Sequence, residues 1–280
     1  MTFYLLDEKA RGIEVRMVAA ADVFMSPALP PPTKLQRIQE VKVGSNPRTV
    51  CHYKGVTYVG LGGGTVCKID SIQAEVASEF AKLDASIVGI IAHSDRLYIL
   101  KHGTPYLVFV FGLQGQQLLK WGFENQSGQA ANAMAIVGDQ LLLADNTNAC
   151  ITIYTLNGEK QRIISCSLIG SGYNSVCECG PDAVVIAHRD SNKVFRVKLS
   201  TGEVEWTSDA VRQPIGACQY SDKYILLTTH DAIQQAKVWI LDSKSGEQTT
   251  TTCVYAREFL YVIKRYWCGS SSTLLVYPKN

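Results

Sequence analysis

A short phrase that recurs about every 40 residues constrains this chain more than any other feature. Each copy consists of the end of one strand, a tight turn that usually carries Asp, and a strongly apolar second strand. The six copies begin at Lys54, Ser94, Gly138, Pro181, Ser221 and Glu258. A period of this length is typical of repeat folds, in which each unit buries its apolar face against its neighbours.

A third strand follows each phrase and ends in a turn that contains glycine. Ile151–Tyr154 precedes Asn157-Gly158, and Val194–Val197 precedes Thr201-Gly202. Apolar residues recur at period two rather than 3.6, which indicates strands and not helices. Three to four strands per repeat predict an all-β fold, a six-bladed propeller of four-stranded antiparallel blades. The alternative is a β-sandwich in which the periodicity arises by chance.

The two ends of the chain predict how such a ring would close. The last repeat has room for only three strands, so we expect the strand-like segment 12–18 to supply its missing outer strand. The whole chain, 1–280, is then one domain, with a closing strand within 1–19 and blades from about 40 to 280. The Pro-rich segment 27–33 is interpreted as an extended connection into the first blade.

Composition narrows the class of protein. Hydrophobic residues make up 46% and charged residues 19% of the sequence, which is typical of a globular protein with a large core. A formal net charge of +2 does not favour binding to nucleic-acid phosphates over the whole surface. The nine cysteines lie mostly in apolar runs, so we expect reduced thiols. No signal peptide or 18-residue apolar run is apparent, so we expect no membrane span and a cytoplasmic location. We also expect a monomer.

Two repeats resemble a known repeat family. Ala144–Glu159 is similar to an NHL repeat, in which an apolar-Ala-Asp-x-x-Asn strand end leads into a third strand and an acidic-Gly turn, and Ala187–Val197 is a weaker copy. The chain therefore resembles the C-terminal propeller of tripartite-motif (TRIM) proteins of the NHL type. The resemblance implies a module that binds protein or RNA. The paired Cys and His residues of a RING or B-box zinc module are absent from the sequence.

The repeats also predict a binding face. Their alignment places one residue of each at the end of the second strand, around the expected channel mouth: Leu61, Lys101, Asp145, His188, Thr228 and Lys264. Cations and aromatic rings adjoin several of these positions. The binding-face candidates are Lys101, His102, Tyr106, Asp145, His188, Arg189, His230, Lys264, Arg265, Tyr266 and Trp267, with Lys193 beside them. Such a surface suits single-stranded RNA or an anionic peptide, which makes a non-catalytic scaffold the first functional hypothesis.

Two other functions stay open. His102, His188 and His230 come from separate blades and could hold a zinc ion, as a metal-dependent lyase or hydrolase with its site in the channel would require. The resemblance adds that an NHL-like propeller in peptide amidation uses zinc held by histidines. Otherwise no cofactor is expected, and no Gly-x-Ser-x-Gly nucleophile motif occurs. Aromatic loops could also bind a carbohydrate.

Overall fold

The structure is a computed structural model that describes residues 2–6, 13–19, 36–44, 46–70, 78–103, 105–122, 131–145, 148–165, 173–229 and 237–253. It contains five four-stranded sheets, which we call blades 1 to 5. Blade 1 consists of β4 (Pro47–Tyr53), β5 (Val56–Leu61), β6 (Thr65–Asp70) and β7 (Ser78–Lys82). Blade 2 consists of β8 (Ile87–His93), β9 (Arg96–Lys101), β10 (Leu107–Gly112) and β11 (Gln117–Gly122).

The remaining blades repeat this plan. Blade 3 consists of β12 (Ala131–Val137), β13 (Gln140–Asp145), β14 (Cys150–Thr155) and β15 (Lys160–Ser165). Blade 4 consists of β16 (Tyr173–Glu178), β17 (Ala183–His188), β18 (Lys193–Lys198) and β19 (Val204–Ser208). Blade 5 consists of β20 (Pro214–Gln219), β21 (Tyr224–Thr229), β22 (Lys237–Asp242) and β23 (Gln248–Cys253). In every blade each strand pairs antiparallel with the next strand in the chain.

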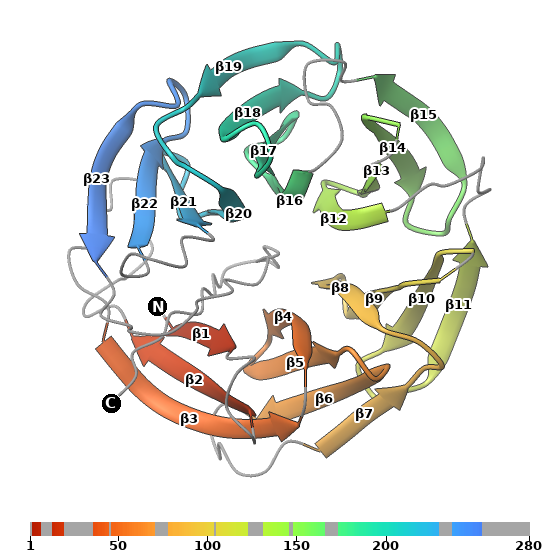
Figure 1. Ribbon diagram of the computed structural model, residues 1–280. Helices are drawn as coiled ribbons and strands as arrows, with labels where there is room; N and C mark the ends of the chain where they lie inside the picture. Colours follow the sequence, from red (N-terminus) through yellow and green to blue (C-terminus); the bar gives the residue numbers. More distant parts are fainter. Residues whose placement is uncertain are drawn as a thin grey trace.

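The blades form a ring, with the first strand of each at the centre and the fourth at the rim (Figure 1). The innermost strands β4, β8, β12, β16 and β20 lie side by side in that order. The all-β propeller of four-stranded antiparallel blades is thereby confirmed. The prediction of six blades was wrong, because the described residues form five four-stranded blades.

A three-stranded sheet from the N-terminus lies in the ring beside blade 1 (Figure 1). It contains β1 (Thr2–Leu6), β2 (Ile13–Ala19) and β3 (Gln36–Gly44), paired in that order. The segment expected to be an outer strand is therefore paired on both sides, by β1 and by β3. Both the Pro-rich segment 27–33 and the last repeat, 254–280, lie outside the described residues.

The phrase found in the sequence is the hairpin between the first and second strands of each blade. In blades 1 and 2 the turn residues are Lys54-Gly55 and Ser94-Asp95, and all four have positive φ. Two such residues in a row are typical of a type I′ turn, whose twist matches that of the flanking strands. The first strand also has an irregularity at the same place in each blade, for example between Pro47 and Thr49 and between Tyr173 and Ser175.

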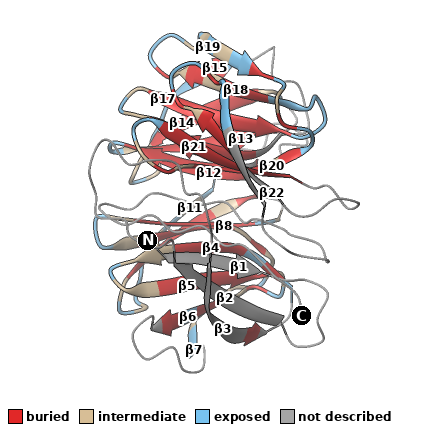
Figure 2. Cartoon of the chain, turned by 90° about the vertical axis from the view of Figure 1, so that its left-hand side faces the viewer, coloured by how far each residue is buried: buried red, intermediate tan, exposed pale blue. Residues whose placement is uncertain are grey.

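The core lies between the blades. All six residues of β17 and of β21 are buried, which explains why second strands have continuous apolar runs instead of alternation. Side chains of β17 then face both neighbouring blades: Ile186 belongs to a cluster shared with blades 1 to 3, and Val185 packs with Ile225 of blade 5. Figure 2 shows that burial is greatest in the inner strands and falls at the rim.

A glycine and a bulky side chain connect successive blades at the rim. The turns between third and fourth strands contain Gly115, Gly158, Gly202 and Gly246, all with positive φ. A Cβ built on Gly158, Gly202 or Gly246 would lie within 3.0 Å of a fourth-strand side chain of the preceding blade, namely Trp121, Ile164 and Trp206 respectively, whereas a Cβ on Gly115 would be 3.6 Å from the backbone oxygen of Phe80. Each glycine thus combines a backbone conformation that L-residues rarely adopt with close contact to the neighbouring blade. None of the described residues forms a helix of the length and apolarity needed to cross a membrane.

Candidate binding face

The predicted binding face is the side of the ring that carries the loops from second to third strands and the connections between blades. We call it the loop face, and the opposite side the turn face. Second strands end on the loop face at Leu61, Lys101, Asp145, His188 and Thr229. Four of these are positions that the repeat alignment predicted. In blade 5 the alignment was wrong by one residue, because β21 ends at Thr229 and not at Thr228.

The residues at these strand ends are buried. His188 is only 3% exposed, and Asp145 and Lys101 are 6% and 8% exposed. The expectation of a polar ring open to the channel mouth is therefore wrong for the described positions. A buried polar group is costly unless it forms hydrogen bonds, so the contacts of these side chains decide what they can do.

The side chains of Asp145 and His188 each cap the loop that follows their strand. Asp145 accepts hydrogen bonds from the backbone N–H of Asn148 at 3.1 Å and from its side-chain amide at 2.9 Å. His188 accepts the backbone N–H of Ser191 on Nδ1 at 3.1 Å. In each case the partner lies three residues further along, which is the geometry of a side chain that caps a turn. The Asp-x-x-Asn motif of blade 3 therefore has a structural role in this chain.

Lys101 is held by an ion pair at the blade junction. Its ammonium donates to Asp84 Oδ1 at 2.6 Å, and Asp84 lies in the connection between blades 1 and 2. The hydrogen bond from Lys101 is the largest of the effects that lower the pKa of Asp84. Lys101 thus joins the end of β9 to the preceding connection and does not present a separate positive charge on the loop face.

Exposed polar groups lie next to these buried ones. His102, Arg189 and Lys193 are exposed, whereas Tyr106 is buried and packs its ring edge to face with His102 at a centroid distance of 5.1 Å. Burial also raises the pKa of the Tyr106 hydroxyl. The buried ring of Tyr106 cannot stack on a nucleic-acid base in this conformation.

The loop that carries Arg189 is fixed at three points. The His188 contact is the first, and the second is a hydrogen bond from Asn192 N to Arg189 O at 3.1 Å. The third joins blade 4 to its connection with blade 5, because Asn192 Oδ1 accepts the backbone N–H of Gln213 at 2.8 Å. Asn192 has positive φ, which asparagine tolerates better than most residues. The loop therefore presents Arg189 from a preorganised backbone.

His230, Lys264, Arg265, Tyr266 and Trp267 lie outside the described residues. Within the described part of the chain, no group of three or more His, Cys, Asp or Glu residues is placed to hold a metal ion. His188 uses Nδ1 to accept a backbone N–H, so that nitrogen is already engaged. The three-histidine zinc site stays a prediction because one of its members is not described.

Comparisons with known proteins identify the fold. No protein-family model matches the sequence, and a search of curated proteins finds no match. Among solved structures, the chain is similar to the WD40 β-propeller domain of Doa1, with 11% identity, a TM-score of 0.66, and coverage of 94% of this chain and 90% of that one. A chain of a nidogen/laminin complex is 13% identical, with a TM-score of 0.71 and 99% of both chains covered.

A third similar structure belongs to a mitotic checkpoint complex, with 10% identity, a TM-score of 0.56, and coverage of 74% of this chain and 65% of that one. At these identities the likeness concerns the fold and not the activity. The resemblance of two repeats to the NHL type is not accompanied by a family match. The chain is therefore identified as an all-β propeller, and its family is left open.

Proposed function

We propose that this chain is a non-catalytic scaffold that binds a protein partner through its loop face. The proposal rests on one observation: the buried polar residues of that face are hydrogen-bonded within the fold, whereas their polar neighbours are exposed. The buried polar residues Asp145, His188 and Lys101 are committed to loop caps and an ion pair, whereas His102, Arg189 and Lys193 beside them are exposed. A rigid loop with an exposed Arg is a favourable binding element, because arginine is enriched at interface hot spots and little ordering is needed on binding.

A protein partner fits this face better than single-stranded RNA does. Binding of single strands relies on exposed aromatic rings for stacking and on an excess of positive charge. Tyr106 is buried, and the exposed Asp190 and Asp209 lie in the same loops as the cations Arg189 and Arg212. Mixed charges of this kind provide specificity towards a complementary protein surface. The named neighbours support the proposal in general, since two come from complexes of proteins.

The test compares two reversed-charge variants on opposite faces. We expect the purified chain to capture a partner from lysate, and Arg189→Glu combined with Lys193→Glu to abolish that capture. Lys160→Glu combined with Lys223→Glu changes the same charge on the turn face and should leave capture intact. Loss of capture after nuclease treatment would show an RNA partner, and equal capture by both variants would contradict the assignment of the loop face.

Several expectations from the sequence remain part of this proposal. They are the NHL-type resemblance, the monomeric state, the cytoplasmic location and a single domain over 1–280. Sedimentation of the purified chain tests the monomeric state. Limited proteolysis tests the single domain, because a continuous domain should resist cleavage between its blades.

A further inference from the structure

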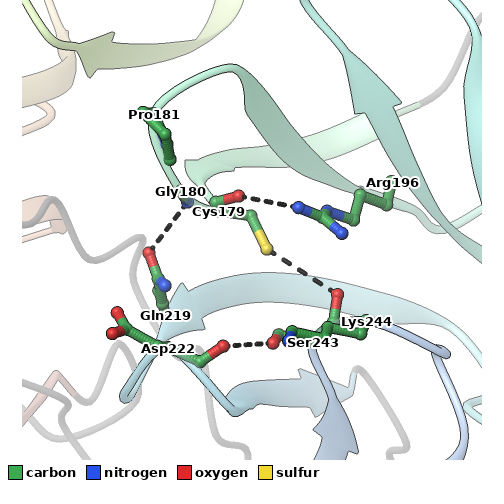
Figure 3. A pocket seen from close by; sticks show the side chains of 8 residues that line it. All are labelled: Cys179, Gly180, Pro181, Arg196, Gln219, Asp222, Ser243 and Lys244. Atoms are coloured by element: carbon green, nitrogen blue, oxygen red, sulfur yellow. Dashed lines mark hydrogen bonds between the residues drawn. The ribbon is translucent and has the colours of Figure 1, made fainter. Parts of the chain in front are cut away.

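A pocket on the turn face lies between blades 4 and 5, away from the loop face. It has a volume of about 460 Å³, within the range of small-ligand sites. Blade 4 contributes Cys179, Gly180, Pro181 and Arg196, and blade 5 contributes Gln219, Asp222, Ser243 and Lys244 (Figure 3). The pocket is therefore built from the two turns of blade 5 on this face and from the first turn and third strand of blade 4.

The pocket lies where three of the other four blades pack an aliphatic side chain, whereas blade 1 has the exposed Lys68 at this position. Arg196 is the fourth residue of β18, and the fourth residues of β10, β14 and β22 are Val110, Ile153 and Ile240. All three aliphatic residues are fully buried, whereas the Arg196 side chain is 21% exposed. The arginine thus places a charge at a junction that three other blades fill with hydrocarbon.

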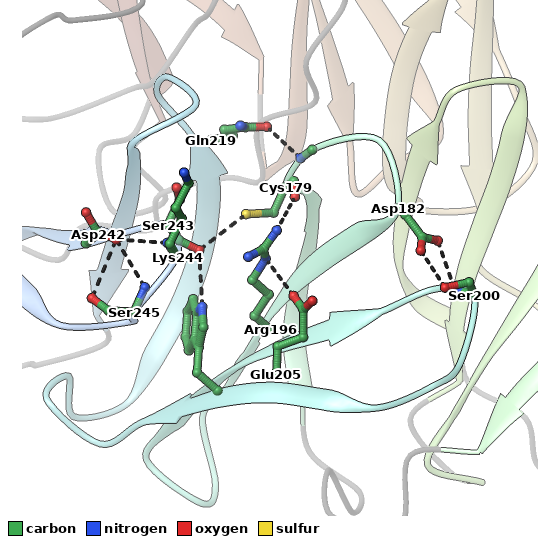
Figure 4. Close-up of polar contacts among 12 residues, drawn as sticks. Cys179, Asp182, Arg196, Ser200, Glu205, Gln219, Asp242, Ser243, Lys244 and Ser245 are labelled. Atoms are coloured by element: carbon green, nitrogen blue, oxygen red, sulfur yellow. Dashed lines mark hydrogen bonds and ion pairs between the residues drawn. The ribbon is translucent and has the colours of Figure 1, made fainter.

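Arg196 is held in place by blade 4 itself. Its Nε lies 3.2 Å from Glu205 Oε2, and its Nη2 donates to the carbonyl oxygen of Cys179 at 3.3 Å (Figure 4). On the blade 5 side, Ser243 O accepts hydrogen bonds from Trp206 Nε1 at 3.1 Å and from Cys179 Sγ at 4.0 Å. The walls of the pocket are therefore connected across the junction, which orients the guanidinium without a ligand.

The charges of the pocket are separated. Figure 3 shows Arg196 and Lys244 on one side and Asp222 on the other. Within the described part of the chain, neither Lys244 nor Asp222 belongs to an ion pair, and both residues are exposed. Burial raises the pKa of the Cys179 thiol to about 11, so this sulfur is protonated at neutral pH and does not act as a nucleophile. The pocket has the groups to bind a ligand and lacks an activated thiol to modify it.

We propose that this pocket binds a short zwitterionic peptide. The peptide carboxylate would lie at Lys244 and at the guanidinium N–H groups of Arg196 that Glu205 and Cys179 O do not engage, and its ammonium at Asp222. Guanidinium and ammonium groups form charge-assisted hydrogen bonds with carboxylates, and the carboxylate of Asp222 can accept an N–H donor of a peptide ammonium. An extended tripeptide spans about 10 Å, which separates its two terminal charges. The site lies on the face opposite to the proposed protein-binding surface, so its occupancy does not depend on that function.

Calorimetric titration with triglycine and its two blocked forms tests the proposal. Triglycine should bind, and N-acetyl-triglycine and triglycine amide should each bind about tenfold more weakly or worse, because each lacks one charged contact. Equal affinity for all three peptides, no binding of triglycine at millimolar concentration, or tighter binding of free glycine would overturn the proposal.

Two variants separate binding from folding. Arg196→Ile introduces the residue that blades 3 and 5 carry at the same place, so the protein should keep its melting temperature and lose triglycine binding. Asp222→Asn should weaken triglycine about tenfold and leave N-acetyl-triglycine unaffected, because that peptide has no ammonium. Lys160→Gln, at the start of β15 on the same face, is the matched control and should bind as the wild type does. Wild-type affinity in Arg196→Ile would contradict the assigned site.

Discussion

Replacement of Gly158 by alanine tests how successive blades are held together. Gly158 has φ +93°, and a Cβ at this position would lie 2.5 Å from Cγ of Trp121 on the preceding blade and 2.6 Å from its Cδ2. These are ring atoms close to the backbone of a side chain that also packs on Tyr154, at a centroid distance of 5.0 Å. Trp121 therefore cannot move away without losing that contact.

Gly180→Ala is the matched control for this prediction. Gly180 has φ +89°, nearly the same backbone conformation, and a Cβ there would have no heavy atom within 4 Å. Both variants carry the cost of alanine at positive φ, and only Gly158→Ala adds the clash. Overpacking typically costs about 1–3 kcal/mol, and each kcal/mol lowers the melting temperature of a protein of this size by roughly 2–4 °C. We therefore expect Gly158→Ala to melt roughly 2–12 °C below Gly180→Ala.

Scanning calorimetry of five proteins tests this contact: the wild type, Gly158→Ala, Gly180→Ala, Trp121→Leu and the double variant Trp121→Leu with Gly158→Ala. In the Trp121→Leu background the additional loss caused by Gly158→Ala should shrink to that of Gly180→Ala, because the clashing ring is gone. The same destabilisation of Gly158→Ala with and without Trp121, or equal melting temperatures for Gly158→Ala and Gly180→Ala, would refute the contact between blades as the reason for the glycine.

Three further predictions concern single side chains. Burial lowers the pKa of His52 from 6.5 to about 4, so the folded state favours the neutral ring; its contribution to stability is complete above pH 6.5 and is lost as the pH falls towards 4. Urea titrations should show at most about 3 kcal/mol of loss over that window in the wild type and a smaller loss in His52→Gln. Asp145→Ala should lower the free energy of unfolding by about 1–3 kcal/mol, since two hydrogen bonds to Asn148 are removed; an unchanged urea midpoint would show that the cap is dispensable. Cys179 should resist iodoacetamide at pH 8 in the native protein and react after denaturation, as measured by mass spectrometry; rapid native alkylation would contradict its burial.

The hairpins were predictable from the sequence because their chemistry is local. Turns such as Ser94-Asp95 and Lys54-Gly55 contain an Asp or a Gly that favours a tight turn, and the short apolar run that follows each of them is typical of a strand buried on both faces. The number of complete blades was not predictable in this way. β1, β2 and β3 form their own sheet without the turn phrase, so the repeat count did not reveal them.

The candidate site was predicted in position but not in exposure. Strand ends could be aligned from the repeats, yet burial depends on how side chains lean against the preceding blade. Successive residues of a strand point to opposite faces of its sheet. The one-residue error that chose Thr228 instead of Thr229 therefore also selected the wrong face of β21. The three-residue spacing of Asp145 and Asn148 did indicate a loop cap, because an Asp side chain can accept the backbone N–H three residues further along and so close a turn.

The contacts at the rim and in the pocket were harder to predict from the sequence. Gly158 and Gly246 recur in the third-to-fourth turns, but their partners Trp121 and Trp206 come from the preceding blade, far away in the sequence. Arg196 differs from the aliphatic residues of blades 2, 3 and 5 only once the strands are aligned in register. Long-range pairing of this kind is set by the assembled ring and not by any local segment.

Hydrogen exchange of the complex with its captured partner tests the central claim most directly. If the loop face is the binding surface, backbone amides in the loops 102–106 and 189–193 should become protected on binding, and the turns at Ser94-Asp95 and Asp222-Lys223 should not change. Protection confined to the turn face, with unchanged exchange in both loops, would contradict the account.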